Sequence, residues 1–298
     1  MKIIECVPNI SEGRDQTKIS AIQDEFRRHP KVRLLNVSSD PDHNRTVFTF
    51  LGDPSDVKEA ALSLAIRAIE LVDMRHHRGG HPRIGAVDVV PFVPIHGVEM
   101  REAVEVARAF GKELGKRRVP VYFYEEAATS PERRDLPTIR KGEYEGLEKK
   151  LKDPKWKPDE GPDAFNPRAG ATVVGARFPL VAYNVNLRTD DLSLAKEIAR
   201  RVRFKDGGFP CVRAMGVDLK DRGRVQVSMN LTNFQVTNIP TVYDFIRGEA
   251  LKRGIEVEDS EVIGLVPLVV LEGIVRHYIK CTHFSINQVI EQRVLESE

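Results

Sequence analysis

The order of predicted secondary-structure elements constrains the fold of this 298-residue chain more than any other feature. Alternating apolar runs and helical apolar stripes follow one another as strand, helix, strand, strand, helix, strand in the first half. The same order returns in the second half, with little residue identity between the halves. This order is that of the split βαβ plait. It predicts an α+β chain of two ferredoxin-like subdomains, residues 1–178 and 179–298, with mixed sheets and helices on the outer faces.

Some segments carry less regular patterns. Residues 126–163 are charged, contain five prolines and lack strand alternation, so we expect a long surface excursion that is either functional or a plain strap. Residues 175–187 are predicted to form one strand. Asp221, Arg222 and Gly223 should form a hairpin turn between two strands of the second half. Residues 268–278 are expected to form the last helix, followed by a short tail.

Composition excludes several classes of protein. The 46 basic residues nearly balance the 44 acidic ones, which argues against a nucleic-acid footprint. No apolar run reaches membrane-spanning length and no signal peptide opens the chain, so no membrane partner is expected. The three cysteines are odd in number and far apart, which fits a reducing cytoplasm without disulfide bonds.

The chemically richest stretch is residues 76–92. It holds three of the eight histidines and a Gly-Gly pair ahead of an apolar strand. Pro82 favours an extended conformation for His81, which would place a titratable ring on a loop anchored by that strand, as general acid–base catalysis requires. A solvated turn explains the same spacing equally well.

Other kinds of site receive less support. His76, His77, His81, His96 and Asp88 were considered as metal ligands, but adjacent histidines seldom share an ion and no metal is expected. Neither a Walker-type phosphate loop nor a dinucleotide-binding glycine motif occurs. Cys6 lies in an apolar strand and should be a buried, inert thiol rather than a nucleophile.

Two further groups of residues invite both functional and structural interpretations. Asn9, Asn44, Asn184 and Asn186 lie in or beside strands, where an amide either bonds a polar ligand or caps a turn. Residues 161–170 form a Gly/Pro loop that serves either as a linker or as a surface on which Phe165 stacks against a flat ring.

Several long motifs, in order along the chain, resemble one family. They are ECVPNISEGR (5–14), NRTVFTF (44–50), HPRIGAVDVVPF (81–92), VGAR (174–177), AYNVNL (182–187) and GLVPL (264–268). The chain resembles the glutamate formimidoyltransferases (formiminotransferases) from end to end. The resemblance implies transfer of a formimidoyl group from N-formimidoyl-L-glutamate to tetrahydrofolate, the co-substrate, in histidine degradation. It also implies two α/β subdomains and a homodimer.

The resemblance assigns roles to residues. The family's catalytic histidine falls on His81, and its folate-binding segment falls on Gly161, Pro162, Asp163, Ala164, Phe165, Asn166, Pro167, Arg168, Ala169 and Gly170. Larger members add a cyclodeaminase domain, which this sequence lacks, so transfer without deamination is expected. The residue before the catalytic histidine, commonly Glu in the family, is Gly80 here, and the loop at residues 38–43 also departs from better-known members.

A mechanism follows as a hypothesis. One histidine with a pKa near its ordinary value would take a proton from the attacking pterin nitrogen and return it to the departing glutamate nitrogen. Asp40 or Asp42 would stabilise the cationic formimidoyl group. Arg45, Arg83 and Arg177 would hold substrate carboxylates. The alternatives are an enzyme that handles 5-formyltetrahydrofolate at the same site and a non-catalytic folate-binding protein.

Overall fold

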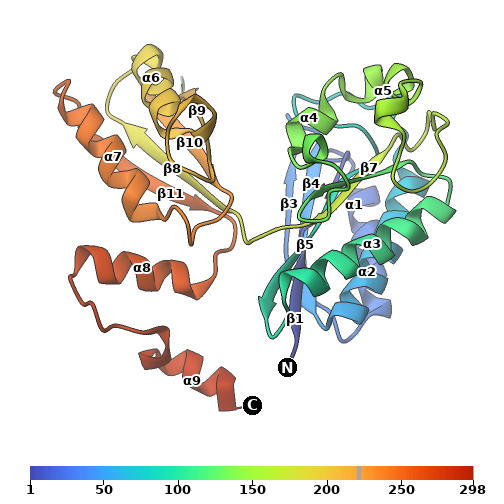
Figure 1. Cartoon of the computed structure of the whole chain (residues 1–298), viewed down its shortest axis with the longest axis horizontal. Helices are drawn as coiled ribbons and strands as arrows, with labels where there is room; N and C mark the ends of the chain where they lie inside the picture. The colour runs from blue at the N-terminus through green and yellow to red at the C-terminus, as the bar shows by residue number, and fades with distance from the viewer. Residues whose placement is uncertain (220–222, 298) are drawn as a thin grey trace. The chain divides into compact units, whose positions relative to one another are not determined.

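The computed structural model describes residues 1–219 and 223–297, and the chain divides into two compact units, residues 1–177 and 178–298 (Figure 1). The first unit is built on a mixed sheet and the second on an antiparallel sheet, each with helices against it. The α+β class and the repeated order of elements are therefore confirmed.

The sheet of the first unit has a plait at its centre and two parallel strands added at one edge. Its order is β3, β4, β1 with β2, β5, β7, β6, where the short β1 and β2 both pair with β4 and β5. Strands β5, β7 and β6 run parallel, while the other pairs are antiparallel. The strand bounds are β1 Ile3–Cys6, β2 Asn9–Ile10, β3 Arg33–Asp40, β4 Arg45–Gly52, β5 Val87–His96, β6 Val121–Glu125 and β7 Thr172–Ala176.

Three helices share the principal core of this unit with one face of the sheet. They are α1 (Gln16–Gln23), α2 (Pro54–Leu71) and α3 (Met100–Lys116), and α2 lies beside α3 (Figure 1). Local chemistry sets where they begin, because the Asp15 and Asp53 carboxylates accept hydrogen bonds from the first backbone N–H groups of α1 and α2. Their small and branched apolar side chains, such as Ala61 and Leu64, are fully buried against the strands.

The predicted surface excursion is wrong in one respect, because it contains helices with a core of their own. The segments are η2 (Pro131–Arg133), α4 (Leu136–Arg140), α5 (Glu143–Leu151) and η3 (Pro154–Trp156). Ile139, Leu147 and Leu151 are buried in a separate apolar cluster with Tyr122 and Val173 from the sheet. The segment therefore covers part of the second face of the sheet rather than strapping its surface.

The single strand predicted over residues 175–187 is also wrong. Its first residues belong to β7, which lies between β5 and β6 in the first unit, and the rest belong to β8 (Val181–Leu187) in the second. Pro179 stands between the two strands, and proline lacks the backbone donor that a continuous strand needs.

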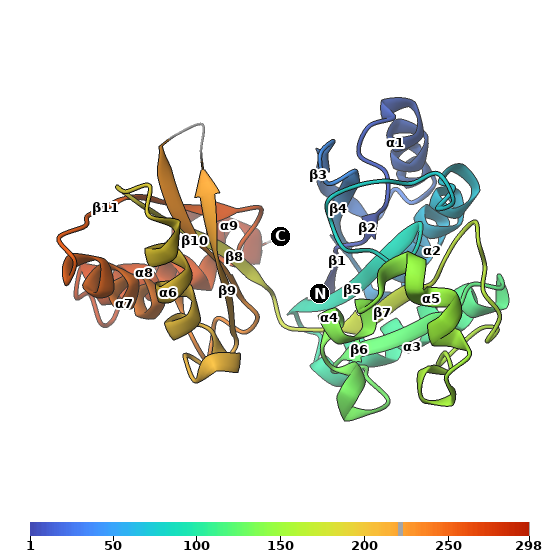
Figure 2. The ribbon, with the colours of Figure 1, turned by 90° about the horizontal axis from the view of Figure 1, so that it is seen from above.

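The second unit is a ferredoxin-like plait. Its sheet has the order β11, β8, β10, β9 and is antiparallel throughout rather than mixed. Helices α6 and α7 pack on one face of this sheet around a shared apolar core (Figure 2). The bounds are α6 Leu192–Val202, β9 Val212–Leu219, β10 Arg224–Leu231, α7 Ile239–Leu251 and β11 Val257–Ile263. Strands β9 and β10 pair as predicted, but Asp221 and Arg222 of the predicted turn lie outside the described residues.

The end of the described chain is more ordered than the expected tail. After α8 (Leu268–Tyr278), which has the predicted bounds, follow η6 (Ile286–Gln288) and α9 (Ile290–Ser297). Within residues 1–219 and 223–297, no helix has the length and apolar character needed to cross a membrane.

Candidate functional site

His81 lies in the loop between α2 and β5, and its imidazole is held by an arginine from the sheet. Arg45, the first residue of β4, donates a hydrogen bond from Nη1 to His81 Nε2 over 2.7 Å. A guanidinium has no acceptor to offer, so Nε2 must carry its lone pair in this arrangement. The ring is thus the neutral tautomer with its proton on Nδ1, which is the form that can accept a proton at Nε2.

The surroundings of His81 favour the neutral ring strongly. Burial, followed by the positive charges of Arg45 and Arg140, lowers the pKa of His81 from its ordinary value of 6.5 to about 3. Hydrogen bonding to the Pro82 backbone acts in the opposite direction but is outweighed. In the unliganded chain the ring is therefore neutral near pH 7 and a weaker base than the imidazole of ordinary pKa in the hypothesis.

This shift predicts how acid affects folding. Above about pH 6.5 the His81 ring is neutral in the folded and unfolded chain, so it adds no pH dependence. Below that pH the His81 ring binds a proton in the unfolded chain, whereas in the folded chain it stays neutral down to about pH 3. The free energy of unfolding therefore falls as the pH falls. Between about pH 7 and pH 4 the ring is protonated mainly in the unfolded chain. In this range we expect the free energy of unfolding to fall less for His81→Gln than for the wild type. Urea titrations at several pH values measure this, and parallel losses would contradict it.

A buried cluster of charges surrounds the ring. Arg140, the last residue of α4, forms an ion pair with Asp88 of β5, and their side chains are only 12% and 3% exposed. Asp88 also accepts a hydrogen bond from the Ile84 backbone N–H at 2.9 Å, which fixes the loop that carries His81. The Nε atoms of Arg45 and Arg140 are buried and have no hydrogen-bond partner among the described residues.

The turn between β3 and β4 forms another wall of this site. The Asp40 carboxylate accepts hydrogen bonds from the backbone N–H groups of Asp42 and His43, and its Oδ2 contacts His43 Nδ1 at 2.7 Å. These interactions with His43 lower the pKa of Asp40, so the carboxylate is ionised near neutral pH. The His43 ring lies 6.0 Å from the His81 ring, centroid to centroid. Asp42 contributes its carbonyl, which accepts from the Gly80 N–H at 3.1 Å.

Asn44 ties the loops of the site together. Its Oδ1 accepts from the Gly13 N–H, its Nδ2 donates to the Arg78 carbonyl, and its own carbonyl contacts His77 Nε2, all at 2.9 Å. Its φ of 49° is left-handed, a conformation in which asparagine is enriched. The predicted ligand-binding amide of Asn44 is thus engaged in holding loops from three parts of the chain.

The two glycines before His81 differ in the space around them. A Cβ on Gly79 would lie 2.2 Å from the His43 carbonyl oxygen, whereas a Cβ on Gly80 would meet only the Asp42 carbonyl oxygen at 3.7 Å. Gly80, the departure from the family pattern, therefore has room for a side chain. We expect Gly79→Ala to cost about 1–3 kcal/mol through overpacking, and Gly80→Ala to cost much less. Chemical denaturation of the pair tests this, and equal losses would show that the close approach at Gly79 does not matter.

The predicted folate segment lies directly beside the loop of His81. Ala86 donates a backbone hydrogen bond to Ala169 at 2.8 Å, Ala171 donates to Ile84 at 3.0 Å, and Gly85 pairs with Gly170 in an isolated bridge. Two stretches of the sequence that were singled out separately are therefore adjacent in space.

Side chains of this segment are partly occupied by the protein itself. Phe165 is half-buried and packs against Tyr144, with ring centroids 5.6 Å apart, so its predicted stacking on a ligand would have to use the rest of the ring. Asn166 Oδ1 accepts from the backbone N–H groups of Arg168 and Ala169, which closes the loop. Arg168 donates to the Glu70 carbonyl at 2.5 Å.

The other two arginines predicted to bind carboxylates interact with different groups of the first unit. Arg83 is 6% exposed and pairs with Glu143 and Glu145 of α5, at 2.9 and 2.6 Å. Arg177 follows β7, and its charge acts on the buried Glu5 carboxyl, whose pKa is raised by burial. The structure therefore brings Arg45, but not Arg83, to His81.

The predicted asparagines differ in what they contact. Asn9 is 4% exposed and donates to the Val7 carbonyl, while its Oδ1 is buried without a partner in the described chain. Asn184 and Asn186 belong to β8 of the second unit, on the sheet face opposite α6 and α7. Their amides donate to Glu261 at 3.1 Å and Asp259 at 2.5 Å.

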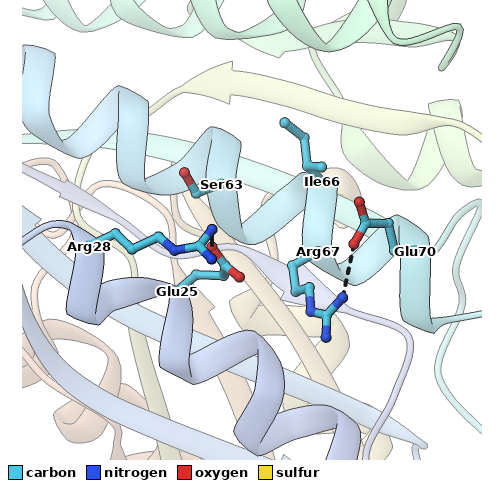
Figure 3. A pocket seen from close by; sticks show the side chains of 6 residues that line it. All are labelled: Glu25, Arg28, Ser63, Ile66, Arg67 and Glu70. Atoms are coloured by element: carbon cyan, nitrogen blue, oxygen red, sulfur yellow. Dashed lines mark hydrogen bonds and ion pairs between the residues drawn. The ribbon is translucent and has the colours of Figure 1, made fainter.

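A surface cavity of about 380 Å³ lies away from these residues, on the outer helices of the first unit (Figure 3). It is lined by Glu25, Arg28, Ser63, Ile66, Arg67 and Glu70. The lining charges are already paired, since Arg28 contacts Glu25 and Arg67 contacts Glu70. None of these residues approaches His81, so this cavity is not the candidate site.

Two alternatives from the sequence can be placed in the structure. Among residues 1–219 and 223–297, no group of three or more His, Cys, Asp or Glu side chains is arranged to hold a metal ion. Cys6 is fully buried, and burial raises the pKa of its thiol well above the ordinary value. A thiol in this environment is not a nucleophile.

Sequence reasoning missed Arg140 and His43 as members of the site. Arg140 lies 52 positions from its partner Asp88, in a segment read as an irregular excursion, so no local pattern marked it. His43 was visible as a histidine within a loop of turn formers, between the aspartates that were proposed.

Comparison with known proteins gives consistent matches over the whole chain. A family model described as the N-terminal subdomain of the formiminotransferase domain matches residues 3–177, and one described as the formiminotransferase domain matches residues 182–296. A glutamate formimidoyltransferase of Thermoplasma acidophilum is 43% identical over 297 residues, covering 99% of this chain and 98% of that protein. One of Streptococcus pyogenes serotype M1 is 44% identical over 299 residues, covering 99% of both chains.

Longer relatives match over part of their length. A formimidoyltransferase-cyclodeaminase of Rattus norvegicus is 47% identical over 273 residues, which is 90% of this chain and 50% of that protein. The chain thus spans about half the length of that bifunctional relative.

Proposed function

Because the chain belongs to the formiminotransferase family, we propose that it transfers the formimidoyl group from N-formimidoyl-L-glutamate to tetrahydrofolate, with His81 as the proton carrier. Formimidoyl transfer rests on two relatives of nearly equal length whose names state that activity. The acceptor and the role of His81 are the proposed steps.

The observation that carries the role of His81 is its hydrogen bond from Arg45. A ring that accepts at Nε2 from a guanidinium is neutral, and Nε2 can take a substrate proton once Arg45 turns from it to the bound substrate. The nearby carboxylate of Asp40 is ionised and would favour a cationic formimidoyl group.

The chemistry balances with one proton moved. The secondary amine of the reduced pterin attacks the amidine carbon and forms a carbon–nitrogen bond, and the new ammonium gives its proton to His81. The imidazolium formed beside two guanidinium groups is a strong acid, so it readily returns that proton to the departing glutamate nitrogen. The bond from the amidine carbon to that nitrogen then breaks and releases L-glutamate. No redox step is needed.

The position of residues 161–170 supports a folate as the acceptor. Backbone hydrogen bonds join the end of this segment to the loop of His81, so a pterin lying along it would reach the imidazole. The segment is adjacent to the base, which is the arrangement that transfer to a pterin nitrogen requires.

A steady-state assay tests the proposal. The purified chain is incubated with N-formimidoyl-L-glutamate and tetrahydrofolate, and we expect 5-formimidoyltetrahydrofolate and L-glutamate in equal amounts. A reaction without acceptor and one with 5-formyltetrahydrofolate are the controls. Folate binding without product, or turnover of the formyl compound alone, would contradict the proposal.

The homodimer implied by the family resemblance and the cytoplasmic location inferred from the cysteines are kept as predictions. Size-exclusion chromatography with light scattering measures the first, and a mass of one chain at micromolar concentration would reject it.

A further inference from the structure

We propose that Arg140 and Arg45 together bind the α-carboxylate of the formimidoyl donor, and that this contact places the leaving nitrogen beside His81. The inference rests on the proposed function and adds a residue, Arg140, and a specific group of the substrate.

The cluster holds more positive than negative charge. The Arg140 side chain is 12% exposed and forms an ion pair with Asp88, whose side chain is 3% exposed. The charge of Asp88 also acts on Arg45. Asp40, the next anion, is an exposed residue at the end of β3 and is already engaged by His43. Two guanidinium groups thus rely on one buried carboxylate. Buried charges are costly unless paired, so the surplus favours binding of an anion.

The hydrogen bonds of Arg45 and Arg140 also favour binding of an anion. The Nε atoms of both arginines are buried and unpartnered among residues 1–219 and 223–297, although buried donors are nearly always satisfied in folded proteins. Burial and the charge of Arg140 also lower the pKa of Arg45 to about 10, as expected for a cation lacking a full counter-charge. A carboxylate bound by these guanidinium groups would supply the missing counter-charge.

The geometry of the donor selects which carboxylate binds. In N-formimidoyl-L-glutamate a single carbon separates the α-carboxylate from the nitrogen that leaves. Arg45 contacts His81 directly at 2.7 Å, so a carboxylate on Arg45 places that nitrogen next to the imidazole. The carboxylates of the folate tail lie at the far end of a long molecule from the reacting pterin nitrogen. Both molecules offer a glutamate carboxylate, and the short distance from carboxylate to reacting nitrogen favours the donor as its source.

Calorimetric titration with stable analogues tests the contact without turnover. The probes are N-formyl-L-glutamate, in which oxygen replaces the imino nitrogen, and 4-formamidobutanoate, which lacks only the α-carboxylate. We expect Arg140→Gln to weaken binding of the first probe by about 10- to 100-fold, the range for hydrogen bonds to charged groups, and to leave the second unchanged. Equal effects on both probes, or no effect on either, would overturn the assignment.

Loss of Arg140 leaves Asp88 unpaired, so a second variant protects the test against misfolding. Asp88→Asn with Arg140→Gln removes both charges, and the same selective loss for N-formyl-L-glutamate is expected. Arg133→Gln is the matched control, because Arg133 forms a buried ion pair with Asp159 at 2.6 Å outside the site. It should leave the affinity for both probes as in the wild type, and a loss as large as that of Arg140→Gln would overturn the proposal.

Kinetic constants separate the two sources of carboxylate. If the donor is bound, Arg140→Gln raises KM for N-formimidoyl-L-glutamate more than it changes kcat or KM for tetrahydrofolate. A rise confined to KM for tetrahydrofolate, absent with tetrahydropteroate, would assign the carboxylate to the folate tail and overturn this inference. Failure of the wild type to form product would contradict the proposed function instead, while the calorimetric result would still report on the anion site.

Discussion

His81→Ala is expected to fold like the wild type and to lower kcat by about 10²–10⁴-fold, the usual range for removal of a general acid–base group. The imidazole is half-buried and its hydrogen bonds are with Arg45 and the Pro82 backbone, so its loss costs little stability. The titratable groups beside it are already engaged, because the His43 ring contacts Asp40 and the Asp88 carboxylate is committed to Arg140. Single-turnover kinetics with saturating substrates measure the effect on chemistry.

His76→Ala is the matched control for this prediction. His76 lies in the same loop but is exposed, and no hydrogen bond of its side chain is present in the described structure. It should retain nearly full activity. A His81→Ala variant with kcat within a few-fold of the wild type and a normal melting curve would remove His81 from the mechanism.

The overall fold was predictable because its signals are local. Alternation such as that of Val181, Tyr183 and Val185 marks a strand within a few residues, and capping carboxylates such as Asp15 mark where a helix begins. Repetition of the order of elements then restricts the topology to a plait in each half.

The helical excursion was not predicted because prolines can be interpreted in two ways. Pro137 suggests an interruption of helical structure, yet it lies in the first turn of α4. Backbone N–H groups in a first turn have no partner within the helix, so proline costs no hydrogen bond there. Leu147 and Leu151 have helical spacing, but two such residues between charged neighbours give a weak apolar stripe.

The electrostatics of the site could not be predicted from the sequence at all. Residues as far apart as Arg45, His81 and Arg140 meet only in the folded unit, and their burial sets the pKa of the ring. The residue pattern and the family resemblance both predicted His81, and the resemblance predicted the folate segment, while the neutral state of the imidazole emerged from its contacts.

Asp88→Ala is expected to destabilise the first unit by about 3–5 kcal/mol, the cost of leaving one member of a buried ion pair without its partner. The substitution leaves the Arg140 guanidinium, 12% exposed, without its counter-charge and also removes the acceptor of the Ile84 N–H. Trp156 is the one tryptophan of the chain and lies in the first unit, so its fluorescence reports urea unfolding of that unit.

A second substitution shows whether the orphaned charge causes the loss. Adding Arg140→Met to Asp88→Ala removes the unpaired cation and replaces it with an apolar side chain that can pack, as substitution of both members of buried ion pairs often permits. The double variant should therefore be more stable than Asp88→Ala alone, although the Ile84 N–H stays unsatisfied. If the double variant is no more stable, the loss arises from that backbone hydrogen bond and from packing. The surplus positive charge inferred from the arginines around His81 would then not destabilise the first unit.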